Sequence, residues 1–264
     1  MAEKNMKYEP LDPDEKLLAE VNEKLKTDPC NPELWYQKGL QHTWKGEGEM
    51  ALHCFSTGLI YAPFNSSLRT WRGRKLMGQS DYTLAISELA TASALNPMDW
   101  EAWYYQGVAA YLEGMYEHAK MCHTKARHLI AKHDPLCLAA TVDWYWMTCM
   151  KLGERDEAKR VVDKYIRADM PAFDGDYLCR TLLYKGDLSP EGFTEKCMAN
   201  IKNPERPRAY YLMLQYGLAN YYHYMGQDDK ATPILIEVAT TKDCQSYFAV
   251  KQAIKDLKER NISY

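Results

Sequence analysis

The first half of the sequence repeats itself every 34 residues, and this period limits the possible folds more than any other feature. The repeated positions are a glycine, an alanine and a proline: Gly39, Gly73 and Gly107; Ala51, Ala85 and Ala119; Pro63 and Pro97. Apolar residues also recur at helical spacing within a unit, as at Trp103, Gly107, Ala110 and Tyr111. Three unrelated positions with one period predict a stack of helix–turn–helix units.

Three segments carry the repeat most clearly, at residues 32–63, 66–97 and 100–131. They resemble the tetratricopeptide repeat (TPR) family. That family has Trp early in the first helix, Gly in its middle, Ala then an aromatic in the second helix, and Pro at the end. The first segment matches this pattern at Trp35, Gly39, Ala51, Phe55 and Pro63. The resemblance covers about residues 32–131. It implies an all-α solenoid of about five to six TPR-like repeats with a capping helix at each end.

After residue 131 the pattern loosens, because Trp146 stands where the mid-helix glycine is expected. We expect the two helices of that unit to lie further apart, and we expect Gly107 to make room for Ala119. An apolar stripe of Tyr247, Val250, Ile254 and Leu257 predicts the last helix. The expected organisation is a flexible N-terminus at 1–11, a first helix from Asp12–Pro13, and one solenoid domain at 12–264 with regular repeats at 32–131, degenerate repeats at 134–240 and a capping helix at 244–260.

Composition excludes several classes of protein. The 33 basic and 36 acidic residues give a net charge of -3, so the basic stripe of a nonspecific nucleic-acid binder is missing. No apolar run approaches the ~20 residues of a membrane span, and the charged N-terminus shows no signal peptide. Eight cysteines without a C-x-x-C motif indicate reduced thiols. We expect a cytoplasmic protein with neither a nucleic-acid nor a membrane partner.

The resemblance also implies which residues of the first helices face a concave groove. The groove candidates are Tyr36, Trp44, Arg74, Tyr104, Tyr111, Asp143, Met147, Tyr216, Asn220 and His223. Such a surface is rich in aromatic and methionine side chains, which suits an extended apolar or mixed segment. The alternative for any one residue is packing against a neighbouring repeat. Our leading hypothesis is an adaptor or scaffold that binds a protein or peptide segment.

Some members of the family bind the acidic C-terminus of a chaperone through a clamp of Lys, Asn and Arg residues. The corresponding positions here hold Tyr36, Leu40, Arg74 and Tyr104. Only Arg74 is basic, so the sequence does not predict binding of an acidic chaperone tail.

The run Arg69, Arg72 and Arg74 has two interpretations. It is either an anion site, because guanidinium groups match carboxylates and phosphates, or a set of charge pairs with acids of the adjoining unit, which we favour. His118 and Cys122 lie four residues apart and share a helix face, but a zinc site needs further ligands. We expect no metal and no cofactor.

The runner-up hypothesis is a small-molecule binder or enzyme with an aromatic-lined pocket. Asp143 has Trp144 and Trp146 close to it on an otherwise apolar helix. A carboxylate among indoles can act as an acid or base, so Asp143 and His223 are a candidate acid–base pair. If the superhelix curls enough, both would meet Arg74 and Tyr104. The commoner role of such an Asp is structural. The sequence contains no nucleophile elbow, phosphate-binding loop or metalloprotease motif. Self-association through a solenoid end is a third possibility.

Overall fold

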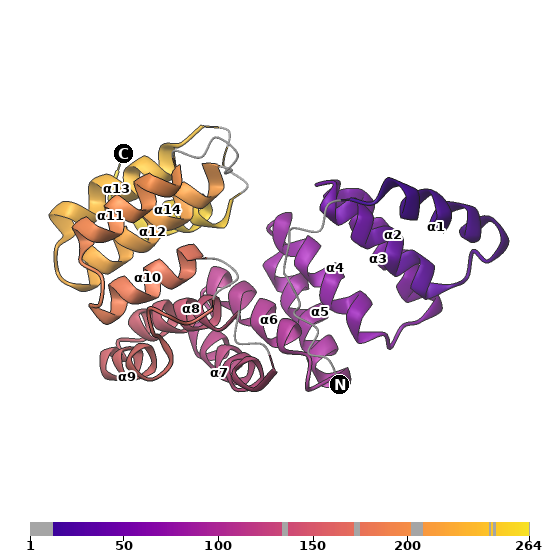
Figure 1. Ribbon diagram of the computed structural model, residues 1–264, viewed down its shortest axis with the longest axis horizontal. Coiled ribbons are helices and arrows are strands. Elements are labelled where there is room, and N and C mark those ends of the chain that lie inside the picture. The colour runs from indigo at the N-terminus through magenta and orange to yellow at the C-terminus, as the bar shows by residue number, and fades with distance from the viewer. Residues whose placement is uncertain are drawn as a thin grey trace. The chain divides into compact units, whose positions relative to one another are not determined.

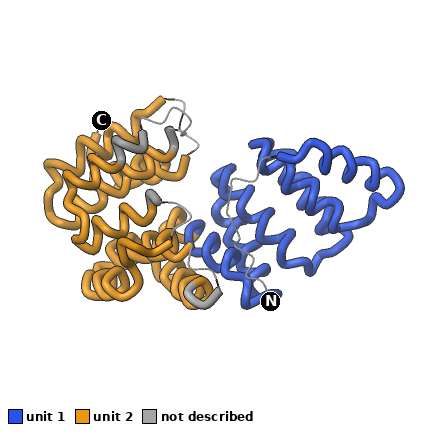
Figure 2. Tube along the Cα trace, in the orientation of Figure 1, with its two compact units in different colours: residues 1–109 blue, residues 110–264 orange. Residues whose placement is uncertain are grey.

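The computed structural model describes residues 13–133, 137–171, 175–201, 208–242, 244 and 247–263. Within these ranges every regular element is a helix (Figure 1), which confirms the all-α prediction. The chain divides into two compact units, residues 1–109 and 110–264 (Figure 2), where the sequence predicts one continuous domain. The predicted flexible segment at 1–11 lies outside the described residues.

Unit 1 is built from helix pairs that follow the predicted repeats. Its helices are α1 (Glu15–Thr27), α2 (Pro32–Trp44), α3 (Gly48–Tyr61), α4 (Ser66–Gly78), α5 (Tyr82–Leu95) and the first ten residues of α6 (Trp100–Glu113). The α2 helix packs against α3, and α4 packs against α5. The cap of α1 is Asp14, whose side chain accepts from the Leu17 amide; Asp12, the predicted start, is outside the described residues. Asn31, Asn65 and Asp81 cap α2, α4 and α5 in the same way.

The repeated glycines make room for the second helix of each pair. A Cβ added at Gly39 would lie 2.4 Å from Cε1 of Phe55, and one at Gly73 would lie 2.6 Å from Cγ of Leu89. The sequence predicts that the repeated alanine fills this space at Gly107. At the two equivalent glycines the nearest side chain is instead the one four residues after the alanine.

A second repeated contact explains the spacing of Trp and Pro. Trp35 Nε1 donates to the Pro29 carbonyl at 2.8 Å, and Trp103 Nε1 donates to the Pro97 carbonyl at 3.0 Å. In the repeat between them Arg69 occupies the Trp position, and its Nε donates to the Pro63 carbonyl at 3.0 Å. Each first helix is thus tied to the end of the preceding second helix.

Unit 2 contains the degenerate repeats and the C-terminal helix. Its elements are the end of α6, then α7 (Tyr116–His133), α8 (Leu138–Lys151), α9 (Arg155–Tyr165), α10 (Gly175–Lys185), α11 (Pro190–Ile201), α12 (Arg208–Tyr224), α13 (Asp228–Thr240) and α14 (Phe248–Glu259). Trp146 stacks on Tyr184 of α10, with ring centroids 3.8 Å apart and planes at 7°. The indole therefore packs against the next first helix, and α8 and α9 remain in contact.

The apolar stripe predicted for α14 is half right, because Val250 and Leu257 are buried but Tyr247 and Ile254 are exposed. Ile254 is 38% exposed, whereas Asp256 is completely buried together with Val250, Ala253 and Leu257. Among the helices of the described ranges, none combines the length and apolarity that a bilayer crossing requires.

Candidate functional site

In unit 1 the groove candidates on α2 are partly exposed. Tyr36, Leu40 and Trp44 are each half-buried. Tyr36 and Leu40 rest on the core cluster around Phe55, and the Tyr36 and Phe55 ring centroids are 6.2 Å apart. Burial raises the pKa of Tyr36. The α2 helix therefore presents a row of aromatic and apolar side chains, anchored at the base and accessible at the edge.

Arg74, the one basic groove candidate, is already fully engaged. Its guanidinium lies 3.7 Å from the ring centroid of Trp71 and 4.2 Å from that of Tyr105. Its Nη1 is 3.1 Å from Glu101 Oε1. Tyr104 is buried, with its ring 4.9 Å from that of Tyr105. Glu101 is the counterion of Arg74, and two aromatic rings pack against its guanidinium. Tyr104 is a packing residue, the alternative given for any groove candidate.

The other two arginines of the run pair with one buried acid. Arg69 Nη1 lies 3.0 Å from Glu88 Oε2, and Arg72 contacts the other oxygen of the same carboxylate. Glu88 belongs to α5, the second helix of the same repeat. The favoured interpretation, charge pairing, is what the structure contains. The acid belongs to the adjoining repeat for Arg74, as expected, but to the same repeat for Arg69 and Arg72.

In unit 2 five of the six groove candidates are interior residues. Tyr111, Asp143, Met147, Tyr216 and Asn220 are all buried. For these positions the structure supports the alternative given above, in which groove-register side chains pack against other helices of the unit.

The centre of this interior is an ion pair that the sequence did not suggest. Arg180 of α10 is 1% exposed and Asp143 of α8 is 0% exposed. Arg180 Nε lies 2.9 Å from Asp143 Oδ1, its Nη2 lies 3.1 Å from Met147 Sδ, and Nε also donates to the Tyr184 hydroxyl at 3.2 Å. The Asp143 carboxylate raises the pKa of Arg180, against the opposing effect of burial.

A glycine on the next first helix gives the guanidinium its space. A Cβ at Gly217 of α12 would lie 2.4 Å from Arg180 Nε. An acid on α8, a base on α10 and a mid-helix glycine on α12 were the available signals in the sequence. The fifth repeat lacks the repeat residues that would have shown that these three positions lie close together.

His223 has a different partner from Asp143. Its Nδ1 lies 2.5 Å from Asp228 Oδ1, near the start of α13, and the imidazole is partly exposed. The two members of the suggested acid–base pair are thus each engaged with another residue. Arg74 and Tyr104, which were expected to meet them in a tightly curled superhelix, belong to unit 1.

No metal centre emerges from the part of the chain that the structure describes. It contains no group of three or more His, Cys, Asp or Glu side chains arranged to hold an ion. Burial raises the pKa of Cys122 to about 12, so this thiol stays protonated at neutral pH.

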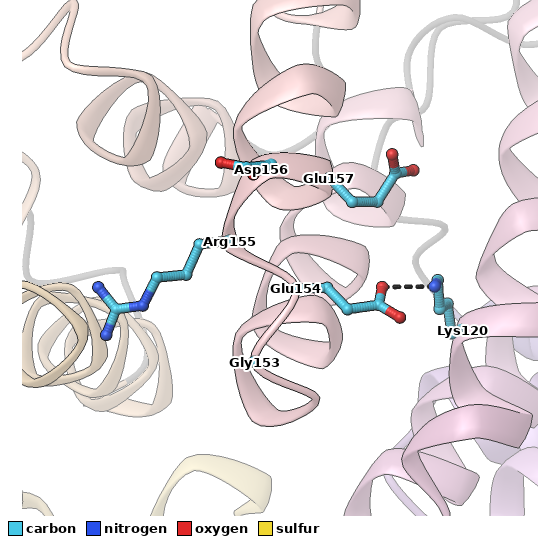
Figure 3. A pocket seen from close by; sticks show the side chains of 6 residues that line it. All are labelled: Lys120, Gly153, Glu154, Arg155, Asp156 and Glu157. Atoms are coloured by element: carbon cyan, nitrogen blue, oxygen red, sulfur yellow. Dashed lines mark ion pairs between the residues drawn. The ribbon is translucent and has the colours of Figure 1, made fainter.

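A surface depression of about 650 Å³ lies between α7 and the start of α9, and its lining residues are charged (Figure 3). Lys120 and Glu154 pair across it, while Arg155 points to the other side and donates to the Tyr224 carbonyl at 2.8 Å. The pKa of Glu157 falls to about 2, chiefly because Arg160 donates hydrogen bonds to it. Two of the acids that line the depression, Glu154 and Glu157, are therefore already paired with cations of the chain.

No protein-family model matches the sequence, and no curated protein matches it. Solved structures do. YrrB, described as a TPR protein with an unusual peptide-binding site, is 12% identical with a TM-score of 0.53, over 90% of this chain and 98% of its own. MamA from residue 41 to its end, from Desulfovibrio magneticus RS-1, is 22% identical with a TM-score of 0.51, over 57% of this chain and 82% of its own. At these identities the likeness establishes the fold alone.

Proposed function

We propose that this chain, a helical-repeat protein with the tetratricopeptide fold, is an adaptor whose unit 1 binds an extended protein segment along α2. One observation carries the proposal: groove-register side chains on α2 remain partly exposed, whereas their counterparts in unit 2 are interior. Half-buried aromatic side chains lose little conformational freedom on binding, and they are frequent at the centres of interfaces.

The chemistry of the row favours an apolar or mixed segment. Tyr36, Leu40 and Trp44 offer apolar area with two polar edges, and Arg74 is neutralised by Glu101. An acidic tail would have to displace Glu101 from Arg74 before gaining an ion pair of its own. The peptide-binding site named for YrrB supports a protein segment as the class of ligand.

The small-molecule alternative depended on Asp143 and His223, and the engagement of Asp143 by Arg180 favours the adaptor over it. We place the adaptor in the cytoplasm, because its eight cysteines are spread along the chain without a C-x-x-C motif, which is typical of thiols in a reducing compartment.

A selection of random linear peptides on the immobilised full chain tests the proposal. Peptides enriched on the native chain are synthesised and their Kd values measured by fluorescence anisotropy. We expect the double substitution Tyr36→Ala, Trp44→Ala to weaken binding at least roughly 10-fold, as for central interface aromatics. Hydrogen exchange of α3 and α5 confirms that unit 1 stays folded.

Ile60→Ala is the matched control, because Ile60 is an apolar side chain on α3, the second helix, and is 74% exposed. It removes accessible apolar area without touching α2, so binding should be unchanged. Equal binding by the double variant and the native chain would refute the α2 row as the binding surface. So would a selection that enriches only peptides sensitive to Ile60→Ala.

A further inference from the structure

The C-terminal helix α14 meets the groove register of unit 2. Counting from the repeat glycine or its substitute, Tyr216 is equivalent to Tyr36, while Leu112, Lys151 and Tyr224 are equivalent to Trp44. Three of these four positions bond directly to α14. Tyr216 OH donates to Asp256 Oδ2 at 2.7 Å, Lys151 Nζ lies 2.7 Å from Asp256 Oδ1, and Lys255 Nζ donates to the Leu112 carbonyl at 2.9 Å.

The fourth position, Tyr224, is affected by the charge of an α14 residue. Burial raises the pKa of Tyr224 to about 12, and the negative charge of Asp256 adds to the increase. The α14 helix also packs against α12 and α13 (Figure 1). The face that is partly open on α2 of unit 1 is therefore occupied in unit 2 by a helix from the chain's own C-terminal end.

The attachment of α14 is specified by a charge more than by apolar area. The side chains that it buries are Val250, Gln252, Ala253, Asp256 and Leu257. Only two of them, Val250 and Leu257, are apolar and larger than alanine. The carboxylate of Asp256 is fully buried and accepts from Lys151, Tyr216 and Gln252. Buried ion pairs contribute modestly to net stability, but they fix the register of the helix that carries them.

The receptor side of this contact is suited to a carboxylate from any helix. Lys151 is held at the end of α8, 5.7 Å from the ring centroid of Tyr116, and is mostly buried. Its other acidic partner, Glu259 at 3.1 Å, also belongs to α14. Without α14, the Lys151 ammonium and the Tyr216 hydroxyl would lose these carboxylate acceptors, and charge-assisted hydrogen bonds of this type are the strong ones.

We propose that α14 is an internal ligand. The groove face of unit 2 is a receptor for an amphipathic helix that presents a carboxylate to Lys151 and Tyr216, and a partner helix of that chemistry exchanges with α14. A partner helix would need apolar side chains at the places of residues 250, 253 and 257 and an acidic side chain at the place of residue 256. It would bind in the helix-in-groove mode of recognition. This site is separate from the one proposed on α2, so either proposal can fail without the other.

The test uses the full chain with a protease site inserted after Thr241, and a fluorescein-labelled peptide of residues 247–263 as the probe. In the uncut chain the tether holds α14 at an effective concentration of about millimolar, so the peptide should not bind. After cleavage we expect the labelled peptide to replace the native segment, detected by anisotropy and mass spectrometry. Hydrogen exchange of α12 and α13 reports whether unit 2 stays folded.

Variants of the peptide and of the chain test whether the Asp256 carboxylate is the group that Lys151 recognises. A peptide with Asp256→Asn should bind roughly 10-fold or more weakly, because it loses the charge-assisted bonds. A peptide with Lys258→Gln is the control, since Lys258 is an exposed charged side chain of the same helix, and it should bind nearly as well as the native peptide. In a cut chain carrying Lys151→Met, the preference for Asp over Asn should disappear.

Three results would overturn the proposal. The first is no exchange after cleavage, with α12 and α13 still protected. The second is unfolding of unit 2 when the native segment is competed away, because α14 would then be a permanent part of the core. The third is equal binding of the native and Asp256→Asn peptides to the cut native chain.

Discussion

Substituting Asp143 by Asn should destabilise unit 2 strongly. The change preserves the size of the side chain, so it opens no cavity. It removes the counterion of Arg180, a guanidinium that is 1% exposed and has no route to solvent without rearrangement. Removing one partner of a buried ion pair costs about 3–5 kcal/mol. We expect the lower end of that range for Asn, whose amide oxygen still accepts a hydrogen bond, and the upper end for Asp143→Leu.

A double substitution distinguishes the cost of an unpaired charge from the cost of changing the side chain at position 143. With Asp143→Leu and Arg180→Met together, neither charge remains, and replacing a whole buried pair by apolar side chains is often neutral or stabilising. We expect the double variant to lie within about 1 kcal/mol of the native chain, well above Asp143→Leu alone. This difference measures the cost of an unpaired buried Arg180.

Urea unfolding followed by tryptophan fluorescence and by circular dichroism measures these changes. Trp144 and Trp146 follow Asp143 directly, and Trp146 stacks on Tyr184, so their fluorescence reports on unit 2. The other five of the seven tryptophans lie in unit 1 and report its unfolding in the same signal. The two units can unfold in separate transitions, and each needs its own fit. Glu101→Gln is the control: it breaks the partly exposed pair with Arg74 in unit 1 and should cost less than about 1 kcal/mol. A cost below about 1 kcal/mol for both Asp143→Asn and Asp143→Leu would refute the reasoning.

Two further predictions concern unit 1. Ser80 has φ = +66°, at the turn position where the preceding repeat has Gly46 at +77°. Ser80→Gly should therefore stabilise unit 1 by about 0.5–1 kcal/mol in urea unfolding. Gly46→Ser should destabilise it by a similar amount through the backbone alone, because a Cβ at Gly46 meets nothing within 4 Å. Burial, assisted by Arg74, lowers the pKa of Lys75 from 10.5 to about 8. The folded chain releases this proton first, so the cost of burying the charged amine is fully present below about pH 8 and is relieved as the pH rises to 10.5. Lys75→Met should therefore stabilise unit 1 by on the order of 1–2 kcal/mol at pH 7, discounted for partial exposure, and the gain should shrink by pH 10; a gain independent of pH would contradict the assignment.

The sequence was sufficient for features that depend on neighbours along the chain. The 34-residue period placed the three helix pairs α2–α3, α4–α5 and α6–α7 within about two residues, at 32–63, 66–97 and 100–131, because helix pairs and their turns are local. The degenerate segment at 134–240 was predicted only as a block, and it contains the helices α8 to α13. The register also identified which side chains of the first helices share a face.

Exposure of that face was not predictable, because it depends on residues far away in the sequence. Asp143 is buried because Arg180 reaches it from α10, and only Gly217 of α12 leaves room for the guanidinium. For α14, a single-helix pattern placed Ile254 in the core and left Asp256 unassigned. The true rotation is set by Lys151 and Tyr216, which lie on other helices.

Equivalent positions in the two units therefore have different consequences. Tyr36 and Tyr216 share one place in the repeat, but Tyr36 ends at an accessible edge and Tyr216 donates to a buried carboxylate. A substitution at Tyr36 changes a surface, whereas one at Tyr216 removes one of the donors that hold α14. The same groove face therefore occurs in both units. It is partly exposed on α2 of unit 1, and in unit 2 the chain's own α14 covers it. Exchange of α14 would make the second copy accessible as well, so a helical partner and an extended partner would bind to different units of one adaptor.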